Sequence, residues 1–178
     1  MVDHVESLYN YHVWANQQII DHLKTLSPEK YQKEMKSVFS SVSKVLSHIY
    51  LVDYGWFNIL EGQNMNEAIQ SSLQLQEKIE KLPIEDLEME FHTLSTRFKS
   101  FLESQEDIEK RIMLDNPWAS LRETSLSEMI LHVVNHGTYH RGNISAMLHQ
   151  LGDSSVMTDY AFYWYSDNVI HQKEVREE

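Results

Sequence analysis

The histidines of the segment LHVVNHGTYHRGN are the residues of this chain best suited to chemistry. They recur at four-residue steps, as His132, His136 and His140. Positions i and i+4 share one face of an α-helix, so two imidazoles at this spacing can reach the same metal ion. His132 and His140 would lie about 12 Å apart along a helix, at about 1.5 Å per residue, whereas bonds to a metal are about 2.0 to 2.1 Å long. The spacing therefore predicts a metal site that uses two of the three.

A helical wheel favours His136 and His140 as the inward pair. At about 100° per residue, His140 lies roughly 40° from the direction of the apolar residues, His136 roughly 80° and His132 roughly 120°. The apolar residues that define this direction are Leu126, Met129, Ile130, Val133, Ile144, Met147, Leu148 and Leu151. We therefore expect His132 to face solvent or to support a ligand without binding the ion itself.

The third ligand must come from another helix, and His48 is the histidine that we favour. It lies beside Val45 and Val52, on the edge of the apolar stripe of a predicted helix over residues 40–62. The competing interpretation is that His48 only forms a hydrogen bond in the core. Three other histidines remain alternatives as ligands: His12, His22 and His92.

The segments that carry the histidines have the apolar spacing of long helices. The sequence predicts helices over residues 3–25 and 40–62, a short helix before Pro83 followed by a longer one from about residue 84, and a last helix over residues 125–151. Ser125 and Glu128 form a capping box at the start of the last helix, and Gly152 can adopt the left-handed conformation that ends it. Four principal helices in 178 residues predict an all-α four-helix bundle, a single domain over residues 1–178.

Two segments lie outside the four principal helices. Asp115-Asn116-Pro117 indicates a turn within residues 109–124, where a short β-hairpin or an irregular loop fits equally well. The segment TDYAFYWY near the end contains too many aromatic side chains to leave in water, so we expect it to pack back on the bundle. Trp14 and Trp56 are interpreted as core packing.

Composition excludes several classes of protein. Fifteen Lys and Arg against 27 Asp and Glu give a formal net charge of -12, which repels nucleic acid phosphates and anionic lipids. No uncharged apolar run approaches the roughly 20 residues that a bilayer requires, and the N-terminus lacks the pattern of a signal peptide, so we expect a cytoplasmic protein without a membrane or nucleic acid partner. The chain has no cysteine, so nitrogen and oxygen atoms must hold any metal.

The segments SHIYLVDYGWFNIL and LHVVNHGTYHRGNISAMLHQLG resemble the DinB/YfiT-like family, whose members are taken to be metalloenzymes. YNYHVWANQQI and TDYAFYWY extend the likeness over most of the chain. The resemblance implies a bundle with up-down-down-up connections, a homodimer, and a site made of one His from the second helix and a His-x-x-x-His pair from the last. These positions fall on His48, His136 and His140. Asn143 stands where the family often has Gln, which shortens a side chain one turn beyond the ligands.

Three neutral imidazoles leave at least one coordination position of a metal open, as in catalytic rather than closed structural sites. A divalent ion there would favour ionised water or a thiolate, which implies metal-assisted hydrolysis or a transfer that uses a low-molecular-weight thiol. Families related by this bundle include thiol-dependent transferases and isomerases, so the resemblance favours the second. Imidazole ligands suit zinc, nickel or iron(II), and the sequence does not separate these metals.

Three further residues near the predicted ligands could support the site. Asp53, Tyr139 and Arg141 could orient a ligand or hold an anionic substrate, although such residues more often make an ordinary surface or interhelical contact. The alternative function is a non-catalytic protein in which the ion braces the bundle or a ligand binds without turnover. Nothing in the sequence identifies a general base.

Overall fold

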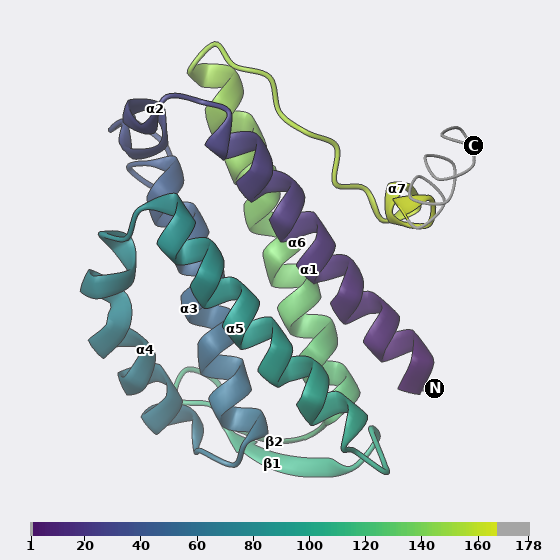
Figure 1. Ribbon diagram of the computed structural model, residues 1–178. Coiled ribbons are helices and arrows are strands. Elements are labelled where there is room, and N and C mark those ends of the chain that lie inside the picture. The colour runs from purple at the N-terminus through teal and green to yellow at the C-terminus, as the bar shows by residue number, and fades with distance from the viewer. Residues whose placement is uncertain (1, 167–178) are drawn as a thin grey trace, which may run out of the picture.

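Four long helices pack side by side and define the architecture (Figure 1). The computed structural model describes residues 2–166. Its elements are α1 (Val2–Lys24), α2 (Pro28–Gln32), α3 (Val42–Leu60), α4 (Met65–Glu80), α5 (Ile84–Glu103), β1 (Arg111–Asp115), β2 (Leu121–Ser125), α6 (Leu126–Gln150) and α7 (Tyr160–Tyr163). In Figure 1, α1 and α6 run in one direction, while α3 and α5 run in the other. The predicted four-helix bundle with up-down-down-up connections is therefore confirmed.

Helix α4 is the crossover that allows α3 and α5 to run parallel. It returns the chain to the end of the bundle at which α3 begins (Figure 1). The sequence predicted only a short helix here, but α4 has 16 residues. It buries few residues, chiefly Met65, Ala68 and Ile79, because it covers the outside of the bundle. Its residues are on average less apolar than those of the four bundle helices.

The predicted helix ends are present in the structure. Ser125 Oγ accepts a hydrogen bond from the backbone N–H of Glu128 at 3.2 Å, and the Glu128 carboxylate accepts one from the N–H of Ser125 at 3.0 Å. This reciprocal pair is the predicted capping box. Gly152 has a φ of 80°, in the left-handed region that favours glycine after a helix. The last helix is thus held at both ends by local chemistry.

The hydrophobic core draws residues from all four long helices. Among its fully buried members are Ile19, Ile20, Leu46, Ile49, Phe98, Leu102, Ile130 and Ile144. The apolar stripe of α3 changes along its length: Val45 is buried, but Val52 and Trp56 are only half-buried. Trp56 therefore packs against the edge of the core and is not enclosed by it, because it also borders a cavity described below.

The segment between α5 and α6 is a β-hairpin, the first of the two structures that the sequence allowed. Strands β1 and β2 pair antiparallel, with Arg111 opposite Ser125 and Asp115 opposite Leu121. Ser125 therefore ends the hairpin and caps α6. No helix within residues 2–166 is both long and apolar enough to cross a membrane.

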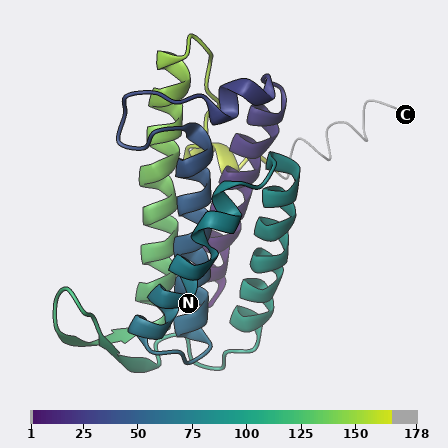
Figure 2. The same cartoon turned by 90° about the vertical axis from the view of Figure 1, so that its left-hand side faces the viewer.

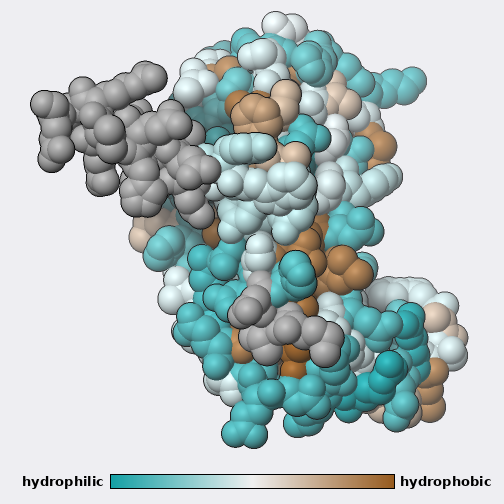
Figure 3. All heavy atoms as spheres, turned by 90° about the vertical axis from the view of Figure 1, so that its right-hand side faces the viewer, coloured by the Kyte–Doolittle hydropathy of each residue, from teal (hydrophilic) through white to brown (hydrophobic). Residues whose placement is uncertain are grey.

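The aromatic tail was predicted to pack on the bundle, and Tyr160 and Tyr163 do pack against α1. Tyr11 donates a hydrogen bond through its hydroxyl to the carbonyl of Thr158 at 2.8 Å, and its ring lies 5.0 Å from that of Tyr160 and 5.9 Å from that of Tyr163. Figure 3 shows this face of the molecule, with a pale band of aromatic side chains above a strip of hydrophobic ones. Three aromatic residues at the end of the tail remain exposed: Phe162, Trp164 and Tyr165.

Helices α1 and α6 approach each other closely at Gly137. A Cβ at this position would lie 2.3 Å from Cε1 and 2.6 Å from Nδ1 of His12, closer than carbon atoms come in folded proteins. At Gly142, one turn further along α6, a Cβ would meet no heavy atom within 4 Å. Position 137 therefore has no room for a side chain, whereas position 142 of the same helix has room for one.

We expect Gly137→Ala to lower the free energy of unfolding by about 1–3 kcal/mol, because the added methyl group overpacks the contact with His12. Gly142→Ala should raise it by about 0.5–1 kcal/mol, because alanine favours the helix and meets nothing. Urea denaturation of the two variants measures both values. Equal stability of the two variants would show that α1 and α6 do not meet as described.

Candidate metal centre

Helices α3 and α6 bring His48, His136 and His140 into one cluster. One ring nitrogen from each residue lies within 4.8 Å of the others, and Nε2 of His48 is 3.2 Å from Nε2 of His136. Two nitrogens bound at about 2.0 to 2.1 Å to a tetrahedral ion stand about 3.3 Å apart. The observed separation therefore fits two ligands of a single ion, and the cluster is compatible with a metal.

The exposure of the histidines on α6 follows the order that the helical wheel predicted. His140 is buried, His136 is half-buried and His132 is exposed. His132 lies outside the three-histidine cluster and packs its ring against Trp56, with 4.7 Å between ring centroids. Phe39, in the loop before α3, lies against the cluster, 5.1 Å from the ring of His48 and 5.5 Å from that of His140.

Burial holds all three imidazoles of the cluster in their neutral form. Burial first, then the neighbouring imidazoles of His140 and His48, lower the pKa of His136 to about 3. Burial and the proximity of His48 lower the pKa of His140 to about 4. The pKa of His48 is also lowered, because its burial outweighs the opposing effect of Asp53. At neutral pH each ring therefore offers a free lone pair, the form that binds a metal.

Asn143 contacts one of the predicted ligands. Its Nδ2 lies 3.3 Å from Nδ1 of His140. The nitrogen and oxygen of a side-chain amide are interchangeable by a 180° rotation, which would place Oδ1 beside this ring nitrogen. Oδ1 would then accept a hydrogen bond from Nδ1–H of His140 and leave Nε2 free for an ion. Asn143, which stands where the family often has Gln, therefore contacts the histidine cluster.

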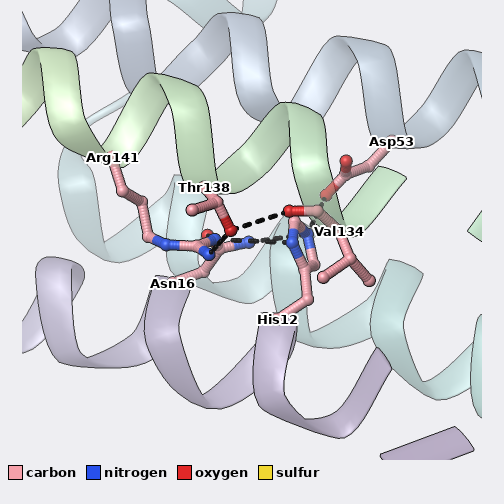
Figure 4. Close-up of polar contacts among 6 residues, drawn as sticks. All are labelled: His12, Asn16, Asp53, Val134, Thr138 and Arg141. Atoms are coloured by element: carbon pink, nitrogen blue, oxygen red, sulfur yellow. Dashed lines mark hydrogen bonds and ion pairs between the residues drawn. The ribbon is translucent and has the colours of Figure 1, made fainter. Parts of the chain in front are cut away.

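Asp53 and Arg141 belong to a buried polar network on the α1 side of α6 (Figure 4). Nε2 of His12 lies 2.8 Å from Oδ2 of Asp53, and Arg141 Nη1 lies 3.4 Å from Nδ1 of His12. Arg141 also donates to Asn16 Oδ1 and to Thr138 Oγ1, each at 2.8 Å. Asn16 Nδ2 also lies 3.0 Å from Nε2 of His12. One imidazole thus links the two buried side chains of Asp53 and Arg141.

The sequence suggested Asp53, Tyr139 and Arg141 as residues that support the metal site. The network accounts for the positions of two of them, Asp53 and Arg141. Arg141 is only 2% exposed, and burial lowers its pKa. Because its side chain donates a hydrogen bond to Asn16 of α1, it faces α1 and not the cluster. Asp53 has its hydrogen bond with His12 and none with the three clustered histidines. Tyr139 is 65% exposed, with its ring 5.0 Å from that of His140.

The alternative third ligands lie elsewhere. His12 is in the buried network, the ring of His22 contacts the carbonyl oxygen of Ser154 at 2.8 Å, and His92 is exposed on α5. Sequence reasoning missed the role of His12. A signal was present in YNYHVWANQQI, because His12 and Asn16 are polar residues four apart on a face that is otherwise apolar.

A cavity of about 730 Å³ adjoins the cluster, between α3, α4, α6 and the hairpin. His48 and His136 form part of its wall, so the cluster is accessible to a small molecule in the cavity. This arrangement can expose one side of a bound ion to a ligand while imidazoles hold the other.

The fold and this site define a helical-bundle protein with a three-histidine cluster compatible with a metal ion. Residues 1–175 match the model of the DinB family. The chain is 47% identical over 165 residues to Protein DinB of Bacillus subtilis (strain 168), an alignment that covers 93% of this chain and 96% of that protein. The chain belongs to the DinB family, which confirms the resemblance found in its sequence.

The lowered pKa values predict that the metal-free protein loses stability in mild acid. An unfolded chain protonates its histidines near pH 6.5, whereas the imidazoles of His136 and His140 stay neutral until about pH 4 or below. Between these values the unfolded state binds more protons, so the free energy of unfolding falls as the pH falls. We expect His136→Gln to flatten this dependence in urea denaturation from about pH 7 to about pH 4.

The matched control is His92→Gln, an exposed histidine remote from the cluster, which should leave the slope as in the unmodified protein. If both variants keep the same slope as the unmodified protein, the cluster does not hold its imidazoles neutral.

Proposed function

We propose that this protein is a metal-dependent enzyme that binds a divalent ion through His48, His136 and His140 and uses it in a transfer involving a low-molecular-weight thiol. Metal-assisted hydrolysis is the second candidate. The observation that carries the proposal is the convergence of three neutral imidazoles, two of which, His48 and His136, form part of the wall of a cavity large enough for a small molecule. Zinc, nickel and iron(II) all suit this ligand set.

The charges of the ligands support a catalytic rather than a structural role. Three imidazoles contribute no negative charge, so they would not neutralise a divalent ion. When bound, such an ion would supply the positive charge that favours the ionised form of a thiol or of water. The imidazoles would hold one side, and the cavity would shield the reacting groups from bulk water.

The energetics of ionisation favour a thiol as the nucleophile. A free thiol has a pKa near 8.5, whereas that of bulk water is about 15.7. The thiol is therefore already close to ionisation at neutral pH, and the site has to lower its pKa by less than it would the pKa of water. It also needs no separate general base, and among the described residues no carboxylate joins the three-histidine cluster.

The proposed ligand set predicts a clear ranking of alanine variants. His136→Ala or His140→Ala should weaken metal binding by more than about a hundredfold, beyond the 10- to 100-fold that loss of a supporting contact costs. His132→Ala should retain tight binding, because its ring is exposed and packs on Trp56. Calorimetric titration of the metal-free proteins with Zn²⁺ gives the three affinities. Equal loss in all three variants would overturn this choice of ligands.

Catalysis itself is tested by reconstitution. Metal-free protein is loaded with Zn²⁺, Ni²⁺ or Fe²⁺ and assayed against a panel of esters and electrophiles, with and without low-molecular-weight thiols. We expect turnover of electrophiles that depends on both metal and thiol, and its loss in His136→Ala. Absence of turnover with every metal, together with a large metal-dependent rise in melting temperature, would instead support a purely structural ion.

A further inference from the structure

The cavity beside the cluster changes in polarity along its length. Its α3 wall extends from Lys44 and His48 to Ile59, and His48 and Ile59 are separated by about 16 Å at about 1.5 Å per residue. Helix α4 runs antiparallel along the cavity and crosses in front of α3 in Figure 2. It therefore places Gln76 and Glu80 near the end of the cavity that contains His48. Lys44, Gln76 and Glu80 thus share this end with the histidine cluster, together with the ring of Phe39.

The other end of the cavity is lined by large apolar side chains. These are Trp56, Ile59, Met65, Ile69 and Trp118, and Leu73 continues the apolar lining to the level of Leu51. His132, which packs on Trp56, and Asn116 are the polar side chains among them. Leu73 and Trp118 line the cavity beside other apolar residues, yet their side chains are 55% and 78% exposed to solvent. Trp118 belongs to the hairpin turn, and the hairpin lies at the end of the bundle where α3 finishes (Figure 2). An apolar molecule seated here would remove both side chains from water.

Helices α3 and α4 approach closely beside this part of the cavity, at Gly55, where an added Cβ would lie 2.9 Å from Oγ of Ser72. Ser72 satisfies its own hydroxyl by hydrogen bonds to the carbonyls of Leu51 and Ala68, both at 3.1 Å. The single hydroxyl hydrogen of Ser72 is therefore shared between these two carbonyls and is not available to a ligand.

We propose that this cavity binds the apolar, elongated body of the substrate and leaves its polar reacting end at the histidine cluster. The inference rests on the proposed function, because it deepens the same site. It assigns the substrate to amphipathic small molecules with a hydrophobic chain or ring system. A volume of about 730 Å³ lies within the roughly 300 to 1,000 Å³ of small-molecule sites, which favours a small molecule over a peptide or a helix of a partner.

Binding of the apolar body is measured without any metal. The probe is N-phenyl-1-naphthylamine, a neutral two-ring molecule whose fluorescence rises in apolar surroundings, titrated into the metal-free protein. We expect saturable binding to one site per chain. No saturable binding, or binding to many sites, would overturn the inference whatever the fate of the proposed metal site.

Two pairs of matched variants locate the bound probe. Leu73→Glu should weaken binding at least about tenfold, because it places a charge in the apolar end, while Met89→Glu makes the same change at an exposed residue of α5 outside the cavity and should alter binding less than about twofold. Trp118→Ala should likewise weaken binding, and Trp164→Ala should not. Equal effects within either pair would place the probe elsewhere.

The orientation of the bound molecule is tested with zinc. 2-Naphthalenethiol carries the apolar rings and a metal-binding end, so loading with Zn²⁺ should tighten its binding at least about tenfold, while the affinity for N-phenyl-1-naphthylamine should not rise. The Leu73→Glu variant should lose most of the advantage of 2-naphthalenethiol over 2-mercaptoethanol. If the neutral probe binds in the cavity but zinc has no effect on the thiol, the metal-dependent function fails and the proposed orientation fails with it, while the cavity site stands.

Discussion

The close approach of α1 to α6 at Gly137 is the constraint that decides where the histidine cluster can form. The ring of His12 occupies the space that a side chain at position 137 would fill, and it lies between Asp53 of α3 and Arg141 of α6. One imidazole therefore joins three helices. Burying Asp53 and Arg141 carries a large desolvation penalty, and their hydrogen bonds to His12, Asn16 and Thr138 offset part of it. The network thus favours a single register of α1, α3 and α6.

The segment His-Gly-Thr-Tyr-His-Arg-Gly combines two functions on one helix. His136 and His140 are four residues apart and face α3, where they meet His48. Gly137 and Arg141 are also four residues apart, rotated by about 100° on the helix, and face α1. The cluster and the network that fixes its surroundings are therefore encoded as two interleaved pairs. A change in the position of α6 would disturb both at once.

The sequence predicted the features that depend on local chemistry. The capping box at Ser125, the glycine that ends α6, and the choice of His136 and His140 over His132 all follow from spacing along one helix, and the structure has the caps and the exposure pattern that they imply. The homodimer, the cytoplasmic location and the binding of a metal remain predictions.

The features that sequence reasoning missed depend on which helices face one another. A buried histidine that forms a hydrogen bond and a histidine that binds a metal look alike on an amphipathic helix, so His12 remained an alternative ligand. Trp56 was interpreted as core because it continues the stripe of α3, but α4 packs obliquely there and leaves a cavity. The length of α4 was underestimated because a crossover on the outside of the bundle buries only one narrow face.

The most direct test of this account is the position of the ion in a crystal of zinc-loaded protein, located by anomalous diffraction at the zinc edge. The account predicts one strong peak per chain, bonded to a ring nitrogen of His48, His136 and His140 at about 2.0 to 2.1 Å, with a further position open toward the cavity. A peak bound to His12 or His132 in place of one of these residues, or no ordered peak at the cluster, would contradict it.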